Sequence, residues 1–171
     1  MSHLKEAVST VKQLIVFQVS LESYALELLN VQEIIRIPHI TRLPKASAFI
    51  KGMVDLRGNI IVLIDLREKF GLDTRQYTRT TRVIIIETSQ KLVGLIVDIV
   101  SKVICLPEGQ ILPPPEINSN TRDNIQIDGV ARFNDELIII LNADSLFTYN
   151  EVQDLVEAAT MAKKYAKQGQ A

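Results

Sequence analysis

The feature that most limits the fold of this 171-residue chain is an internal repeat. Residues 14–38, LIVFQVSLESYALELLNVQEIIRIP, align without gaps with residues 83–107, VIIIETSQKLVGLIVDIVSKVICLP. Residues 52–70, GMVDLRGNIIVLIDLREKF, align in the same way with residues 129–147, GVARFNDELIIILNADSLF. The offset grows from 69 to 77 residues, so the second copy carries the longer middle loop. A repeat of this kind predicts two equivalent structural units.

Each copy reads as about five short strands separated by Gly, Pro and Asn, a pattern that favours small β-barrels. A lone core is marginal in a unit of this size, so we expect the two halves to pack through an apolar seam. The predicted strands are residues 14–20, 24–30, 32–37, 52–57, 59–64, 82–88, 92–99, 101–106, 126–133 and 136–141.

The repeat also sets the expected domain boundaries. They are a flexible N-terminal tail at 1–13, a first β-barrel half at 14–80, a second at 81–148, and a C-terminal helix and tail at 149–171. Asn150 and Gln153 resemble a capping box at the start of that helix. Its predicted apolar stripe consists of Val152, Leu155, Val156 and Ala159.

Composition excludes several classes of protein. The net charge is −1 and the pI is about 6.1, and no block of like charge appears, which argues against nucleic-acid binding. The apolar runs are too short to cross a membrane, and residues 1–10 lack the apolar core of a signal peptide. The single Cys105 cannot form an internal disulfide and fits a reducing cytoplasm. Its place in an apolar strand predicts a small core residue.

The triplet Asp-Leu-Arg occurs twice, at 55–57 and at 65–67. In the second, Asp65 follows a strand and has Glu68 at N3 and Gly71 at C′, which predicts the N-cap of one helical turn with Arg67 on its outside. Asn142, another good cap, aligns with Asp65 in the repeat. We therefore predict a structural role for the second triplet.

In the first triplet, Asp55 and Arg57 alternate with apolar residues along a strand. Gly58-Asn59 is predicted to form the tight turn that follows, which places Arg57 at a hairpin tip. Asn134 occupies the matching position in the second copy, so the repeat does not duplicate this arginine. Spacing alone favours a solvated arginine on a β-turn.

Signals for enzyme chemistry are weak. The sequence has no phosphate-binding glycine loop, zinc-protease motif or nucleophile elbow. His3 and His39 lie far from each other and from Cys105, so no metal set or cofactor site is predicted. Asp98, in the apolar run GLIVDIV, could be a buried carboxylate, but such a residue more often lies at a strand end with its head in water.

Several segments together resemble the CheW family of chemotaxis coupling proteins. They are LNVQEII, LPKASAFIKGMVDLRGNIIVLIDLREKFG, KLVGLIVDIVSKV and ILPPPE, and the resemblance runs from residue 14 to residue 147. It implies an all-β fold of two intertwined five-stranded SH3-like barrels with short helices and a C-terminal helix. It also implies a protein without catalytic activity or cofactor, and a free-standing CheW-like chain fits better than the kinase domain or the receiver fusion.

The resemblance further implies an adaptor in the cytoplasm that is recruited to membrane-associated receptor arrays. Its partners would be the CheA histidine kinase, through that kinase's CheW-like regulatory domain, and the cytoplasmic tip of methyl-accepting chemoreceptors. The kinase would bind the first barrel, at residues that no sharp motif marks. Carried over by position, the receptor-binding residues are Val31, Glu33, Arg57, Gly58, Val93 and Gly94.

The family commonly has Asn at the position of Asp55, and a carboxylate there could pair with Arg57. A CheW-like adaptor of a pilus-motility or other chemosensory array is the alternative within the same class. A small β-barrel hydrolase or transferase using Asp98 or Asp65 is the alternative from another class. An SH3-like nucleic-acid binder is disfavoured by the pI and by the lack of aromatic residues near basic ones.

Overall fold

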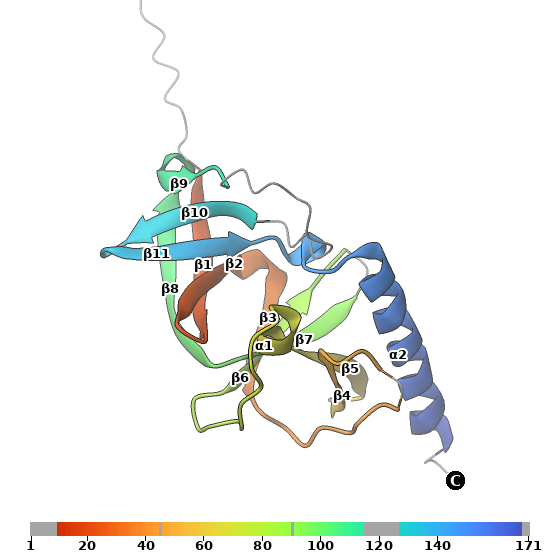
Figure 1. Cartoon of the computed structure of the whole chain (residues 1–171). Coiled ribbons are helices and arrows are strands. Elements are labelled where there is room, and N and C mark those ends of the chain that lie inside the picture. The colour runs from red at the N-terminus through yellow and green to blue at the C-terminus, as the bar shows by residue number, and fades with distance from the viewer. Residues whose placement is uncertain (1–9, 45, 90, 115–126, 169–171) are drawn as a thin grey trace, which may run out of the picture.

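The computed structural model describes residues 10–44, 46–89, 91–114 and 127–168. These residues form two β-sheets with a long helix packed at one side (Figure 1). The strands are β1 (Val11–Val19), β2 (Glu22–Glu27), β3 (Val31–Arg36), β4 (Ile50–Leu56), β5 (Asn59–Asp65), β6 (Arg82–Glu87), β7 (Leu92–Val97), β8 (Ile99–Pro107), β9 (Ile111–Leu112), β10 (Ile127–Phe133) and β11 (Glu136–Leu141). The helices are η1 (Leu28–Asn30), α1 (Leu66–Lys69), η2 (Glu108–Gln110), η3 (Ala143–Ser145) and α2 (Tyr149–Gln168).

The two sheets have the same strand order once the repeat is taken into account. One sheet runs β8-β1-β2-β11-β10-β9 and the other runs β3-β6-β7-β5-β4. The repeat aligns β1, β2 and β3 with β6, β7 and β8, and it aligns β4 and β5 with β10 and β11. Each sheet therefore takes one hairpin, β1–β2 or β6–β7, from one half of the chain and its remaining strands from the other half. This exchange confirms the intertwined all-β fold, with the two-residue β9 as a sixth strand in one sheet.

The exchange explains why the central strands read as unbroken apolar runs. Along β5, Ile61 and Leu63 point into the barrel of the five-stranded sheet, while Val62 and Ile64 point into the seam between the barrels. In β1, Leu14 and the alternate residues face the other barrel's interior, and the residues between them join the same seam. Because both faces are buried, neither can be polar. The expected apolar seam is thus the largest cluster of the fold.

Three local expectations are wrong. Strand β1 begins at Val11, inside the predicted tail, because residues 11–13 pair with the end of β8. The end of the predicted strand 24–30 is the helix η1. Cys105 is exposed, because successive residues of β8 alternate between the barrel interior and solvent, and Cys105 falls on the solvent side. Residues 1–9 with His3, and residues 115–124 of the middle loop, lie outside the described residues.

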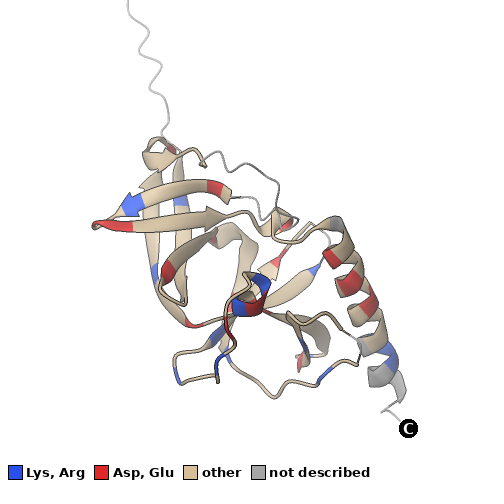
Figure 2. Ribbon diagram, viewed as in Figure 1, with Lys and Arg blue, Asp and Glu red and all other residues tan. Residues whose placement is uncertain are grey.

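Helix α2 begins one residue earlier than its predicted cap. Thr148 and Glu151 form the capping box: the Glu151 N–H donates to the Thr148 hydroxyl at 3.3 Å, and the Thr148 N–H donates to the Glu151 carboxylate at 2.8 Å. The helix carries acidic side chains along its first turns and lysines near its end (Figure 2), which suits its macrodipole. Of its predicted apolar stripe, Leu155 is buried in the seam cluster, Ala159 packs against that cluster, and Val152 and Val156 are half-buried. Ala158, which the prediction did not include, is buried as well.

Candidate functional site: the Arg57 turn and its surroundings

Arg57 and Gly58 form the two-residue turn between β4 and β5. Their φ angles are +53° and +85°, and two positive values in succession define a type I′ turn. The prediction that Gly58-Asn59 makes this turn is wrong by one residue, since Asn59 already belongs to β5. The Gly58 N–H donates to the Asp55 carboxylate at 2.9 Å. Asp55 therefore fixes the turn instead of pairing with Arg57.

The guanidinium of Arg57 pairs with Glu33 instead. Its Nη2 lies 2.8 Å from the Glu33 Oε1, and the two side chains are 76% and 29% exposed. Glu33 lies in β3 and Arg57 follows β4, which are the two edges of the five-stranded sheet. The ion pair links these two edge strands, which approach each other because the sheet is strongly curved. An exposed pair contributes only about 0–1 kcal/mol to stability, and most of the guanidinium stays open to a partner.

The other predicted site residues are less accessible. Val31 is half-buried against the seam cluster, and Val93, 2% exposed, belongs to that cluster. Gly94 faces the barrel interior, where an added Cβ would lie 2.3 Å from the Leu63 Cδ2. The structure therefore brings Glu33 and Arg57 together, holds Val31 beside the seam, and buries Val93 and Gly94.

Comparison with known proteins identifies the family. The CheW-like domain matches residues 13–151. The chain belongs to the CheW-like family. Chemotaxis protein CheW of Klebsiella aerogenes is 35% identical over 141 residues, which cover 82% of this chain and 84% of that protein. Chemotaxis protein CheW of Bacillus subtilis is 31% identical over 149 residues, covering 87% and 95%.

A solved structure agrees with this assignment. The crystal structure of the scaffolding protein TtCheW from Thermoanaerobacter tengcongensis matches with a TM-score of 0.75 and 37% identity. The match covers 83% of this chain and 96% of that one. Within the part of this CheW-like chain that the structure describes, no helix is long and apolar enough to cross a membrane.

The second triplet contributes to a buried charge pair. Arg67 is only 7% exposed in its side chain, so the expectation that it lies outside α1 is wrong. Its Nε and Nη2 donate to the Asp98 carboxylate at 2.7–3.0 Å. The Ser20 N–H donates to the same carboxylate at 2.7 Å. The pair fixes the start of β8 to α1.

The electrostatics of Asp98 do not suit a general acid or base. Burial alone would raise its pKa, but the hydrogen bonds from Arg67 and from the Ser20 N–H outweigh burial and lower the pKa. A cavity of about 220 Å³ adjoins the pair and includes Tyr77, whose pKa burial raises to about 12. Asp98 is thus held as a structural anion in this CheW-like fold.

Asp65 caps α1 as predicted. Its carboxylate accepts from the Arg67 N–H at 2.9 Å, and burial raises its pKa. Asn142, the repeat equivalent, caps η3 by accepting from the Asp144 N–H at 2.9 Å and the Ser145 N–H at 3.2 Å. Both copies of the repeat therefore end in a short helix whose N-terminus is capped by a side-chain oxygen, from Asp65 in the first copy and from Asn142 in the second.

We expect Asp65→Ala to lower the free energy of unfolding by about 1 kcal/mol, because the buried N–H of Arg67 loses its acceptor. Urea unfolding at neutral pH measures the change. Asp65→Asn, which keeps an acceptor oxygen, is the control and should lose less than the alanine variant. Equal stability of Asp65→Ala and the wild type would contradict the capping role.

Sequence reasoning missed how α2 is attached to the body of the protein. The ammonium of Lys69 in α1 lies 2.5 and 2.6 Å from the two carboxylate oxygens of Glu151, and its side chain is 2% exposed. The rings of Phe49 and Phe147 lie 5.5 and 5.9 Å from the same ammonium. The residues are 82 positions apart, so no local pattern signals the pair. The contact holds the first turn of α2 firmly against α1.

Proposed function

We propose that this chain is a non-catalytic chemotaxis adaptor that couples methyl-accepting chemoreceptors to the CheA histidine kinase. The scaffold role rests on membership of the CheW-like family and on the likeness to a scaffolding protein. The chain would act in the cytoplasm, at receptor arrays. The kinase's regulatory domain, itself CheW-like in this family, would bind the surface of the first half of the repeat, residues 14–80.

The observation that carries the receptor part of the proposal is the setting of Arg57. Its side chain is 76% exposed, yet its backbone is fixed by the type I′ turn and its guanidinium by Glu33. A positive φ is unfavourable for arginine and suits asparagine, which occupies the equivalent turn position at 134 with φ +49°. The fold does not need arginine here, so its charge is better explained by a binding role.

An arginine held in this way suits a receptor helix. The guanidinium presents several fixed donors that match carboxylates or the carbonyls at a helix end, and arginine is a frequent anchor at interfaces. Val31, half-buried in β3 two residues from Glu33, would add apolar contact. We propose that the receptor tip binds over Val31, Glu33, Arg57 and Gly58, while Val93 and Gly94 shape the surface from beneath.

We expect Arg57→Glu to reduce receptor-stimulated kinase activity by at least about tenfold, because it places two carboxylates together and removes the anchor. The assay is kinase autophosphorylation in a reconstituted mixture of receptor membranes, kinase and this chain. The Tm should change by no more than about 2 °C, since the side chain is exposed.

Arg57→Asn is the matched variant, because asparagine accepts the positive φ and lacks the guanidinium. It should keep the wild-type Tm and lose coupling as well. Full kinase stimulation by a folded Arg57→Glu protein would refute the receptor assignment. A large loss of Tm in both variants would make Arg57 a structural residue instead.

A further inference from the structure

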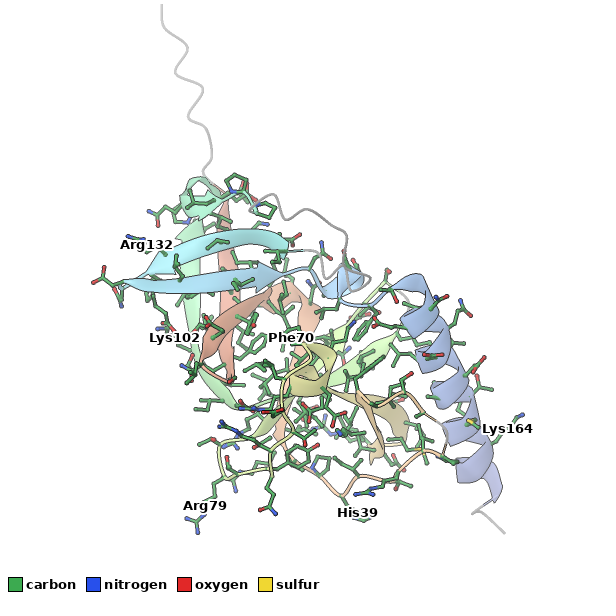
Figure 3. All side chains as sticks on the ribbon, in the orientation of Figure 1. His39, Phe70, Arg79, Lys102, Arg132 and Lys164 are labelled. Atoms are coloured by element: carbon green, nitrogen blue, oxygen red, sulfur yellow. The ribbon has the colours of Figure 1, made fainter. Side chains whose placement is uncertain are left out.

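A cleft of about 470 Å³ opens beside the loop that connects α1 to β6. Figure 3 shows Arg79 at the outer corner of this loop. The residues that line the cleft are Arg36, Ile37, Thr78, Arg79, Thr81 and Arg82. Among the described residues no Asp or Glu lines it, so the three arginines give the cleft an excess of positive charge.

Two of these arginines lie directly opposite each other. Arg36 of β3 and Arg82 of β6 are Cα partners in the antiparallel ladder. Like charges at opposite positions of a ladder destabilise the sheet. Within the described part of the chain, neither they nor Arg79 forms an ion pair. An anion in the cleft would therefore relieve a repulsion that the described residues leave uncompensated.

The guanidinium of Arg82 is already held in place by backbone oxygens. Its Nη1 donates to the Arg79 carbonyl at 2.7 Å and to the Thr81 carbonyl at 2.9 Å. No described residue accepts from its Nε or Nη2, so these donors can bind another acceptor. The loop is ordered by its own bonds, because the Thr78 N–H donates to the Thr81 hydroxyl at 2.8 Å. A ligand would therefore meet a site that is partly formed in advance, which lowers the entropy lost on binding.

The lining of the cleft indicates which kind of anion it suits. Ile37 is the one apolar residue among the described residues that line it, whereas protein interfaces rely on apolar and aromatic anchors. Guanidinium groups bind phosphate oxygens through paired hydrogen bonds. A lone carboxylate has one charge for three arginines, but a polyphosphate brings several charges close together. The lining thus favours a small polyphosphate over a protein segment.

We propose that this arginine cleft binds the polyphosphate group of a small molecule, such as inorganic triphosphate or a nucleoside triphosphate. Arg36 and Arg82 bind phosphate oxygens from the sheet, and Arg79 binds them from the loop. The site is separate from the proposed receptor contact. Glu33 and Arg36 are three positions apart in β3, so their side chains leave opposite faces of the strand.

The test titrates the full chain with inorganic triphosphate in a calorimeter, in buffer without magnesium so that the phosphate charges are not masked. We expect saturable binding to the wild type and at least about tenfold weaker binding to Arg36→Gln/Arg82→Gln. ATP should bind within about threefold of inorganic triphosphate, because no aromatic side chain lines the described cleft to stack on the base.

Arg132→Gln is the matched control. Arg132 is an exposed arginine of β10 in the other sheet, does not line the cleft and lies far from Arg79 in Figure 3. This variant should bind inorganic triphosphate like the wild type. The fold is checked separately, because removing one of two opposed charges should leave the Tm of Arg36→Gln equal to or above that of the wild type.

NMR spectra locate the site. In ¹⁵N-labelled protein the amides of Arg79 and Arg82 should shift as inorganic triphosphate is added, and that of Glu33 should not. The proposal is overturned if inorganic triphosphate does not bind, or if ATP binds and inorganic triphosphate does not. It is also overturned if Arg132→Gln weakens binding as much as the double variant, or if the shifts centre on Glu33.

Discussion

Asp98→Ala is expected to lower the free energy of unfolding by about 3 kcal/mol, because it leaves the buried guanidinium of Arg67 without its anion. That guanidinium would keep only a 3.2 Å hydrogen bond to the Asp73 carbonyl. The Ser20 N–H would also lose its acceptor. Urea unfolding, followed by two spectroscopic probes to test for two-state behaviour, measures the loss.

Removing Arg67 instead of Asp98 should lower the free energy of unfolding by a smaller amount. Arg67→Met replaces the buried side chain with an apolar one of similar length and leaves Asp98, which is 29% exposed and keeps the Ser20 N–H. Water can reach that carboxylate, so we expect a loss of about 1–2 kcal/mol. If Arg67→Met costs more than Asp98→Ala, then the carboxylate is the less hydrated partner and the assignment of the buried charge is wrong.

The pair also has a pH signature. The pKa of Asp98 is lowered in the folded state, so the folded protein binds this proton less readily than the unfolded chain. Its stabilisation is complete above the unfolded pKa of about 3.9 and is lost as the pH falls through the lower folded value. The stability difference between the wild type and Asp98→Ala should therefore shrink between about pH 5 and pH 3. A constant difference would contradict an ionised Asp98.

The sequence predicts the strands and the two barrels of this fold better than it predicts which strands pair with each other. The repeat and the alternation along each strand indicate two equivalent barrels and a seam, and local cap signals place Asp65 and Asn142 correctly. Side-chain periodicity predicts which face of a strand is buried, but it does not predict which strand lies beside it. The pairing of β3 with β6, and of β8 with β1, is therefore invisible in the pattern. The Arg67–Asp98 pair has no local signal either, because it depends on that exchange.

The sequence likewise predicts some features of the candidate site and not others. Hairpin chemistry predicts an exposed Arg57, since a turn residue has few neighbours. Its partner Glu33 could not be predicted, because the two lie on opposite edges of a sheet that meet only when the sheet curls. Val93 and Gly94 look accessible by analogy but belong to buried strand faces. The position of α2 could not be predicted either, because its contact with α1 joins Lys69 and Glu151, which are 82 positions apart in the sequence.

Gly52→Ala is the second substitution with a large expected effect, a loss of about 3 kcal/mol in the free energy of unfolding. Gly52 has φ +146°, and an added Cβ would lie 2.2 Å from the backbone oxygen of Thr41. That oxygen accepts from the Met53 N–H at 2.8 Å, and the Thr41 N–H donates to the Met53 carbonyl at 3.0 Å. Because the clash is with backbone, the methyl group can fit only if this bridge to β4 opens.

The repeat supplies the control for this prediction. Gly129 is the equivalent glycine, at the same irregularity in the pairing of β10 with β11 as Gly52 occupies between β4 and β5. A Cβ on Gly129 would lie 2.7 Å from the Leu112 oxygen and 2.6 Å from the Ile111 Cγ2, but its φ is not in the left-handed region. Gly129→Ala should therefore cost less, about 1–2 kcal/mol.

Thermal unfolding of the two alanine variants separates the cost of the steric clash from the cost of the positive φ at Gly52. For a chain of this length we expect the Tm to fall by about 6–12 °C in Gly52→Ala and by about half as much in Gly129→Ala. The difference measures the cost of the positive φ together with the closer approach of Thr41. Equal shifts would mean that the backbone angle at Gly52 carries no penalty, and an unchanged Tm in Gly52→Ala would mean that the bridge between Thr41 and Met53 moves freely. Either result would contradict the view that this glycine is required by the close approach of two backbone segments.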